Sequence, residues 1–218
     1  MGTKKYEKSI KYEYYWKSCN NYTDFVSYLN QLNEIYNTNP KSVLEIGVGN
    51  KLVYNQLKEL GIKVTSLDIN ENLKPDIIGD IRKLPFPDNS FDTVVAFEVL
   101  EHIPFSDFEK SLIELKMVSK KFVIISIPIR KIGVEFHMWL PKIHQIYFYI
   151  DLPIPIKNKG VVSDSDCHYW EVNKIGFSKS KIIKIIKKHF LIKKQFRPRF
   201  NKYHLFFVLE KTKWNVID

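Results

Sequence analysis

Two glycines and two carboxylates are spaced for binding a nucleoside. The strand-like run Ser42–Ile46 leads into Gly47-Val48-Gly49, and Asp68 follows 19 residues after Gly49. Glycines at such a turn let a ligand approach the backbone and leave amide N–H groups free for anionic groups. An acid at the end of the following strand can accept hydrogen bonds from both ribose hydroxyls of an adenosine. The spacing therefore predicts a ligand that contains adenosine.

Two further residues discriminate between nucleoside cofactors. The dinucleotide fingerprint needs a third small residue where the helix packs closely on the strand, and Leu52 stands at that position. Glu45, just before the turn, would repel a pyrophosphate but suits a ligand with an ammonium group and a sulfonium. A nicotinamide cofactor is therefore disfavoured.

The elements around this turn alternate between short apolar runs and amphipathic stretches. A helix is predicted over Leu52–Leu60, capped by Gly61. Strands are predicted at Ser42–Ile46, Lys63–Leu67, Asp76–Ile78, Phe91–Phe97 and Phe122–Ile127. Continuous apolar strands of this kind are typical of a parallel sheet covered by helices on both faces.

The flanking segments differ in character. Residues 1–40 are polar and aromatic, with a helix predicted over Tyr22–Tyr36 from the helical spacing of Phe25, Leu29, Leu32 and Tyr36. Residues 130–172 are expected to be irregular, because prolines stand among their aromatics. The remainder predicts a helix over Ser178–His189 and two strands, Leu191–Arg197 and His204–Lys211.

The amino-acid composition limits the classes of protein to which this chain can belong. The 218 residues carry a net charge of +10, but nearly all the cations are lysines, and phosphate or base recognition usually draws on arginine. Cys19 and Cys167 form neither a disulfide framework nor a zinc motif, which suits a reducing compartment. The longest apolar run, Phe122–Ile129, is too short and too interrupted to span a bilayer, and the first residues lack the apolar core of a secretory signal. We therefore expect a cytoplasmic protein.

Further motifs follow the glycine turn and Asp68 along the chain. Gly79-Asp80-Ile81 comes before Leu84-Pro85-Phe86-Pro87, and strand Phe91–Phe97 runs into Glu98-Val99-Leu100-Glu101-His102. Together with the glycine turn, these motifs resemble the class I S-adenosylmethionine-dependent methyltransferases of the type-11 group. The resemblance implies an α/β, Rossmann-like three-layer αβα sandwich with sheet order 3-2-1-4-5-7-6 and strand 7 antiparallel. It also implies S-adenosylmethionine as the cofactor of a single domain spanning residues 1–218.

The resemblance carries cofactor contacts onto matching positions. Glu45 would meet the methionine end of the cofactor, Asp68 its ribose, and Asp80 its adenine amino group. The full set is Glu45, Gly47, Gly49, Asp68, Ile69, Asp80, Ile81 and Phe97. One position departs from the family, because Lys51 stands where a further glycine is usual. A wider turn, or a lysine beside the cofactor carboxylate, would follow.

Methyl transfer from a sulfonium requires mostly in-line positioning, and a general base only if the nucleophile arrives protonated. The candidate catalytic residues are His102, His168 and Glu98, since histidines can titrate near neutrality and Glu98 would face the methyl group. We expect no metal. An alternative takes Glu98, Glu101, His102 and His168 as magnesium ligands, because such a set resembles that of small-RNA 2′-O-methyltransferases.

The expected acceptor is a small molecule methylated at oxygen or nitrogen. It would lie beneath a cap formed by residues 1–40, in which Tyr12, Tyr14, Tyr15 and Trp16 could close over the cofactor, and a substrate lid of residues 130–172. Two alternatives stay open: an RNA or protein methyltransferase that uses the lysine excess, and a non-catalytic module that only binds the cofactor. Nucleic acid is not the favoured partner.

Overall fold

The computed structural model describes residue 13 and residues 21–141, 144–152 and 168–212. Its helices are α3 (Tyr22–Asn37), α4 (Leu52–Glu59), α5 (Phe108–Val118) and α6 (Lys179–His189). Its strands are β1 (Ser42–Ile46), β2 (Lys63–Asp68), β3 (Ile77–Ile78), β4 (Phe91–Phe97), β5 (Ser119–Pro128), β6 (Gly133–Leu140), β7 (His144–Asp151), β8 (Phe190–Phe196) and β9 (His204–Lys211). The four predicted aromatics near the N-terminus and both cysteines fall outside these ranges.

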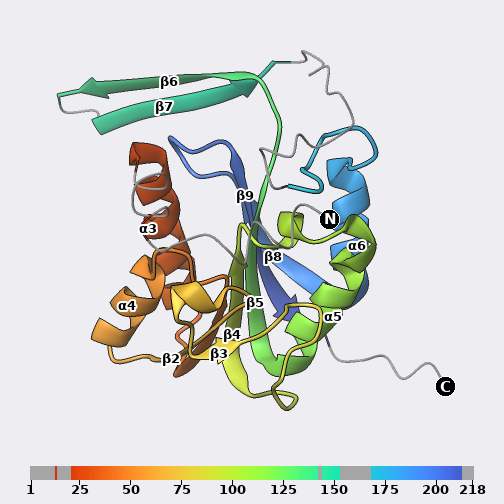
Figure 1. Ribbon diagram of the computed structural model, residues 1–218. Helices are drawn as coiled ribbons and strands as arrows, with labels where there is room; N and C mark the ends of the chain where they lie inside the picture. Colours follow the sequence, from red (N-terminus) through yellow and green to blue (C-terminus); the bar gives the residue numbers. More distant parts are fainter. Residues whose placement is uncertain (1–12, 14–20, 142–143, 153–167, 213–218) are drawn as a thin grey trace.

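A seven-stranded sheet forms the centre of the molecule (Figure 1). Its order is β3-β2-β1-β4-β5-β9-β8, and β9 is antiparallel to both of its neighbours. Numbered without the separate β6–β7 pair, this is the expected order 3-2-1-4-5-7-6. The fold class predicted from the sequence is confirmed.

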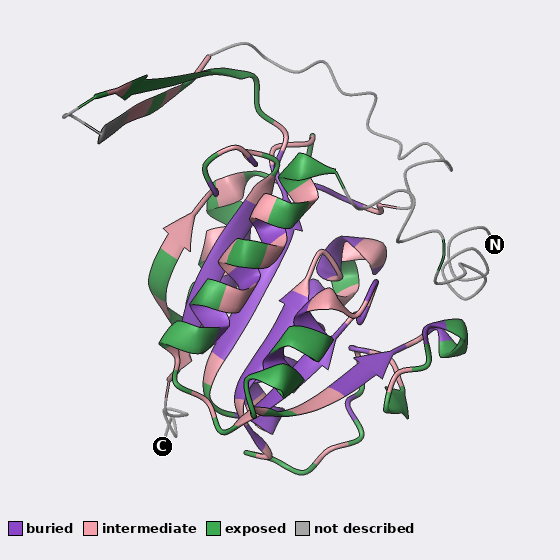
Figure 2. Ribbon diagram, turned by 90° about the vertical axis from the view of Figure 1, so that its left-hand side faces the viewer, coloured by how far each residue is buried: buried purple, intermediate pink, exposed green. Residues whose placement is uncertain are grey.

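Helices cover both faces of the sheet, because its strands bury apolar side chains on both sides (Figure 2). On one face, Leu44 and Ile46 of β1 belong to the same hydrophobic core as the buried residues of α5 and α6. On the other, α3 and α4 meet Val43 of the same strand. This alternation along β1 explains why its sequence is apolar at successive positions.

The predicted helix boundaries hold to within a residue or two. Ser178 is the N-cap of α6 and accepts a hydrogen bond from the Lys181 amide, and Gly61 follows α4 with φ +77°. The side of α3 that packs was not foreseen. Its apolar Leu29 is 66% exposed, whereas Gln31 is 5% exposed. The apolar spacing therefore identified the helix but not its buried side.

Residues 130–172 are not irregular throughout, so that part of the prediction was wrong. Strands β6 and β7 pair antiparallel from Gly133↔Asp151 to Leu140↔His144 as a separate ribbon. Aromatic side chains alternate there with apolar ones, which hid the two-residue period of a strand. No helix in the described part of the chain combines the length and apolarity needed to cross a membrane.

Candidate active site

A cavity of about 380 Å³, here called the central pocket, opens where the parallel strands β1, β2 and β4 end. Open α/β sheets bind ligands at this edge, because loops diverge there. The sheet contributes residues 45–50, 67–70, 79–82 and 97–99. The other walls come from α3, from residues 102–104, from His168 and Tyr169, and from Tyr203 and His204. Segments far apart in the sequence therefore meet around one space.

All the residues that the sequence selected for cofactor binding or catalysis line this pocket. The cofactor set is Glu45, Gly47, Gly49, Asp68, Ile69, Asp80, Ile81 and Phe97, and the catalytic set is Glu98, His102 and His168. Their placement agrees with the prediction, while their individual roles remain predictions.

The glycine turn after β1 depends on Gly47. Its φ is +82°, and its amide donates to the Leu67 carbonyl at 2.9 Å. A Cβ there would stand 2.4 Å from the Val99 Cγ2 atom. Glycine is required both by the backbone conformation and by this close approach.

Lys51, the departure from the family pattern, has φ +61° and precedes the first turn of α4. A side chain in this left-handed region costs about 1–2 kcal/mol, which is why a glycine would suit the position. The Lys51 ammonium donates to the Lys74 carbonyl, and the residue does not line the central pocket. The lysine is therefore held away from the place expected for the cofactor carboxylate.

Asp68 is fixed by the backbone around it. Its Oδ2 accepts from the Val48 amide at 2.9 Å and its Oδ1 from the Asn70 amide at 2.8 Å. The residue is 9% exposed and borders the pocket. Each carboxylate oxygen can accept more than one hydrogen bond, so the group can also receive ribose hydroxyls.

Asp80 lies on a turn that it stabilises itself. Its carboxylate accepts from the Arg82 amide at 3.0 Å and from the Arg82 guanidinium, which also reaches Asp107 at 3.2 Å. The predicted contact with an adenine amino group would share this carboxylate with Arg82. Ile81, beside it, is 4% exposed and belongs to the main hydrophobic core.

Glu45 is the most perturbed acid of the pocket. It is 4% exposed, and its Oε2 atom has no hydrogen-bond partner. Burial, with repulsion from Asp68, raises the pKa of Glu45 to about 8 against a small opposing effect of Lys51. A buried carboxylate without a partner is suited to a cationic ligand that would restore its charge.

Replacing Glu45 with glutamine is expected to raise the melting temperature by about 5 °C at pH 8.5. The pKa rises from 4.5 to about 8 on folding, so over that range the folded state keeps a proton that the unfolded state has lost. The free energy of unfolding of the unsubstituted protein therefore falls as pH rises from about 4.5 to about 8. Thermal melts of both proteins at pH 5 and pH 8.5 measure the difference.

Glu59, an exposed acid on α4, provides the control. Its replacement with glutamine should leave the pH dependence unchanged. A melting temperature of the Glu45→Gln variant that tracks the unsubstituted protein at both pH values would contradict the assignment.

His168 is oriented by a buried acid, Glu171. Its Nδ1 lies 3.2 Å from Oε1 of Glu171, which is 0% exposed and also pairs with Arg130 and Lys174. Burial alone would raise the pKa of Glu171, but hydrogen bonds from His168, Arg130 and Lys174 hold it well below its usual range. An ionised Glu171 favours a proton on Nδ1, and the Nε2 atom on the other side of the ring lies 3.9 Å from Glu101 Oε1.

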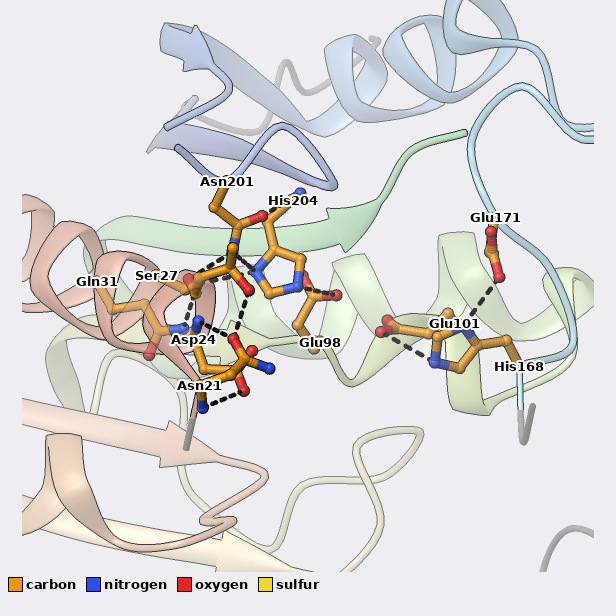
Figure 3. A network of polar contacts seen from close by, with 11 residues as sticks. Asn21, Asp24, Ser27, Gln31, Glu98, Glu101, His168, Glu171, Asn201 and His204 are labelled. Carbon is orange, nitrogen blue, oxygen red and sulfur yellow. Dashed lines mark hydrogen bonds and ion pairs between the residues drawn. The ribbon is translucent and has the colours of Figure 1, made fainter. Parts of the chain in front are cut away.

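Glu98 turns toward His204 rather than toward His168 (Figure 3). Its Oε2 lies 3.4 Å from His204 Nε2, and His204 Nδ1 is 2.8 Å from the Ser27 hydroxyl of α3. Glu98 has φ +53°, a strained backbone for a residue with a side chain. The end of β4 is thus connected through His204 to α3.

Glu101, His102 and His168 form a tight cluster. Each offers a potential ligand atom, and these atoms lie within 4.8 Å of one another. Glu101 is fully buried with its Oε1 3.9 Å from His168 Nε2, and burial together with nearby Glu98 raises its pKa well above the usual value. Three of the four residues of the magnesium alternative are therefore together, while Glu98 is directed to His204.

Sequence reasoning missed the contributions of Tyr28, Gln31, Tyr203 and His204 to the pocket. The sequence did contain an indication that His204 belongs to the pocket. It begins the predicted last strand, and β9 runs antiparallel to β5 with His204 beside Pro128, at the ligand-binding edge. The residues of α3 had no such signal, because they occupy the side of the helix opposite to its apolar stripe.

A comparison with known protein families matches the segment of the chain that builds most of this pocket. A family described as the methyltransferase domain matches residues 44–125, which span β1 to β5 and hold the glycine turn, Asp68, Asp80 and Glu98. Residues 44–125 of this chain therefore match a methyltransferase domain. This match supports the predicted resemblance to S-adenosylmethionine-dependent methyltransferases. A search of curated protein sequences finds no significant match.

Solved structures agree with this fold. The N-methyltransferase NodS from Bradyrhizobium japonicum, in complex with S-adenosyl-L-homocysteine, aligns with a TM-score of 0.61 at 12% identity, over 96% of this chain and 97% of that one. Magnesium protoporphyrin IX methyltransferase from Synechocystis gives 0.61 at 15% identity, over 96% and 98%. A Burkholderia thailandensis 1,6-didemethyltoxoflavin-N1-methyltransferase gives 0.60 at 14% identity, over 92% and 85%.

Proposed function

We propose that this chain is an S-adenosylmethionine-dependent methyltransferase that modifies an oxygen or nitrogen atom of a small molecule held in the central pocket. The main support for this proposal is the acidic lining of the pocket. The chain as a whole has a net charge of +10, yet the pocket is lined by Asp24, Glu45, Asp68, Asp80 and Glu98, with Arg82 paired to Asp80. An acidic cavity in a basic protein favours cationic ligands and disfavours the phosphates of RNA. The alternative of an RNA substrate is therefore less well supported.

The residues fit S-adenosylmethionine, which supplies an electrophilic methyl group on a cationic sulfur when bound. The unpartnered Oε2 of Glu45 suits the ammonium of the methionine end, and Asp68 the ribose hydroxyls. The close approach of Gly47 and Val99 keeps the backbone turn narrow. Ile69 and Ile81 offer apolar surface for the adenine.

In this proposal, His168 accepts the proton of the acceptor's hydroxyl or amine. The residue lines the pocket, its Nδ1 is paired with Glu171, its Nε2 lies 3.9 Å from Glu101 Oε1, and His102 packs edge-on against its ring at 4.9 Å between centroids. Glu98 and His204 line the neighbouring wall and would position the acceptor. A cytoplasmic location and a substrate lid in residues 130–172 are further parts of the proposal.

The test is a methyl-transfer assay with labelled S-adenosylmethionine on a panel of small hydroxyl and amine compounds and on bulk RNA. We expect label in a small molecule, insensitive to salt, and a kcat about 10²-fold lower in the His168→Ala variant with unchanged affinity for S-adenosylhomocysteine. His189→Ala, on α6 and paired with Glu109 outside the pocket, should behave as the unsubstituted protein. Label recovered in RNA alone would refute the proposal.

The cluster of Glu101, His102 and His168 supports one second candidate, a metal-assisted transfer. The same assay distinguishes it. Activity abolished by a chelator and restored by Mg²⁺ would favour the metal. Activity that a chelator leaves unchanged, with the loss in His168→Ala retained, would favour the histidine as a base.

A further inference from the structure

The ribbon of β6 and β7 has two chemically different faces. Paired residues of an antiparallel ribbon point to the same side, and successive residues alternate. The register Val134↔Ile150, Phe136↔Phe148 and Met138↔Ile146 therefore collects six apolar side chains on one side. We call this side the apolar face; its members are Val134, Phe136, Met138, Ile146, Phe148 and Ile150.

The apolar face is largely exposed to solvent. Val134 is 53% exposed, Ile150 54% and Phe148 47%, and Phe136 stacks on Phe148 across the strands. None of the six belongs to a hydrophobic core cluster of the described residues. Figure 1 shows the ribbon extending beyond the main sheet and above α3. Contiguous apolar surface of this kind marks an interaction site.

The opposite face holds the ribbon against the body of the protein. His137 and Tyr147 pack on the Phe200 ring, and Glu135 accepts from the Phe200 amide at 2.9 Å. The Arg197 guanidinium pairs with Asp151 at 2.7 Å. These contacts fix the orientation of the ribbon, so its apolar face is directed outward.

Cationic side chains cluster on the side of the ribbon opposite to the apolar face. Arg199 and Lys202 lie over the Tyr147 ring, and Lys131 pairs with Asp151 at 2.7 Å. Burial, with repulsion by Arg197 and Arg199, lowers the pKa of Lys202 against the attraction of Glu135. In the described structure around the ribbon, Lys131, Lys179, Arg197, Arg199 and Lys202 face the carboxylates of Glu135 and Asp151. Cations are therefore in excess.

The dimensions of the ribbon argue against a second copy of the chain as the occupant. Strands of eight residues give a face of about 27 Å by 10 Å, or about 270 Å² per partner. A stable interface needs about 800 Å² from each partner. A lipid surface needs no matching shape, and modest apolar insertion combined with cationic attraction is sufficient for reversible binding.

We propose that the β6–β7 ribbon binds peripherally to anionic membrane surfaces, with its apolar face in contact with the lipid. Trp139, 65% exposed near the turn of the ribbon, is on the side opposite to the apolar face and would sit at the headgroup level, where tryptophan is favoured, rather than in the lipid. Arg199 and Lys202 lie over the Tyr147 ring on the other side of the ribbon, and from there they would attract the anionic headgroups. This binding goes beyond the proposed function, because it requires neither cofactor nor acceptor.

Co-sedimentation of the full chain with vesicles tests the proposal. We expect binding to phosphatidylcholine vesicles that contain about 30% phosphatidylglycerol, weak binding to pure phosphatidylcholine, and loss of binding at high salt. The double variant Phe136→Ser with Phe148→Ser should lower the partition coefficient roughly tenfold or more. Arg199→Gln with Lys202→Gln should have a similar effect on anionic vesicles alone.

Leu191→Ser serves as a matched control, because Leu191 is 53% exposed on β8, away from the ribbon. Each variant is first checked for an unchanged melting temperature and unchanged affinity for S-adenosylhomocysteine. Should the ribbon variants misfold, quenching of tryptophan emission by brominated lipid, reduced in Trp139→Phe, gives an independent measure. Vesicle binding that the ribbon variants leave intact, absence of binding to both vesicle types, or a dimer that the Phe136→Ser with Phe148→Ser variant makes monomeric would each overturn the proposal.

Discussion

Replacing Asp68 with alanine is expected to lower the affinity for S-adenosylhomocysteine by at least roughly 100-fold. Hydrogen bonds to a charged acceptor contribute about 1.5–3 kcal/mol each, and the proposed ribose contact would involve two. The substitution also removes the acceptor of the Val48 and Asn70 amides, so the glycine turn loses its support. Isothermal calorimetry with the purified variant measures the affinity.

Asp76 allows the loss of binding to be separated from a loss of stability. It accepts from the Ser66 amide at 2.8 Å just before β3, but it does not line the central pocket. Asp76→Ala should lower the melting temperature and leave the affinity for S-adenosylhomocysteine unchanged. If both alanine variants bind equally well, the ribose role of Asp68 is wrong.

Trp170→Ala is expected to destabilise the protein by about 3–5 kcal/mol, because it empties a site in the centre of the core. The indole is 0% exposed and donates to the Ile103 carbonyl at 3.1 Å. Its ring lies 5.0 Å from that of Phe105 and 5.1 Å from that of Phe108. At about 2–4 °C for each kcal/mol, a fall in melting temperature of roughly 10 °C should be measured by calorimetry.

The same substitution should weaken catalysis in the protein that remains folded. Trp170 fixes the segment that carries His168, and the neighbouring Tyr169 amide donates to the Glu101 carbonyl at 2.8 Å. Trp139→Ala is the matched control, because that indole is 65% exposed on the ribbon. A melting temperature that falls equally in both variants would show that burial does not determine the effect.

The sequence was sufficient to predict the sheet and the part of the pocket built on it. Apolar runs such as Val43-Leu44 and Val94-Val95 can only be buried on both faces of a sheet, and the glycine turn and Asp68 follow such runs directly. These residues are placed by local chain direction. Their positions could therefore be inferred without knowledge of any long-range contact.

The parts that could not be predicted depend on contacts between distant segments. The buried side of α3 carries Ser27, Gln31 and Glu34 beside Ile35, because it faces the pocket and pairs with Lys194. Of the predicted apolar stripe, Phe25, Leu29 and Tyr36 are exposed, and Leu32 alone packs on the core. Local pattern and global structure conflict there, as they often do at functional sites. The ribbon escaped prediction for a similar reason, since its inward face mixes aromatic residues such as Tyr147 with the charged Glu135 and Asp151.

The position of β9 constrains the order in which the molecule can be completed during synthesis. It lies between β5 and β8, although both of these precede it in the chain. Until β9 leaves the ribosome, β5 keeps an open edge and β8 has no neighbour in the sheet, and unpaired edges of this kind expose nascent chains to aggregation. His204 arrives with the same strand. The wall of the pocket is therefore closed only after β9 has emerged, later than the strands β1, β2 and β4 that end at the pocket.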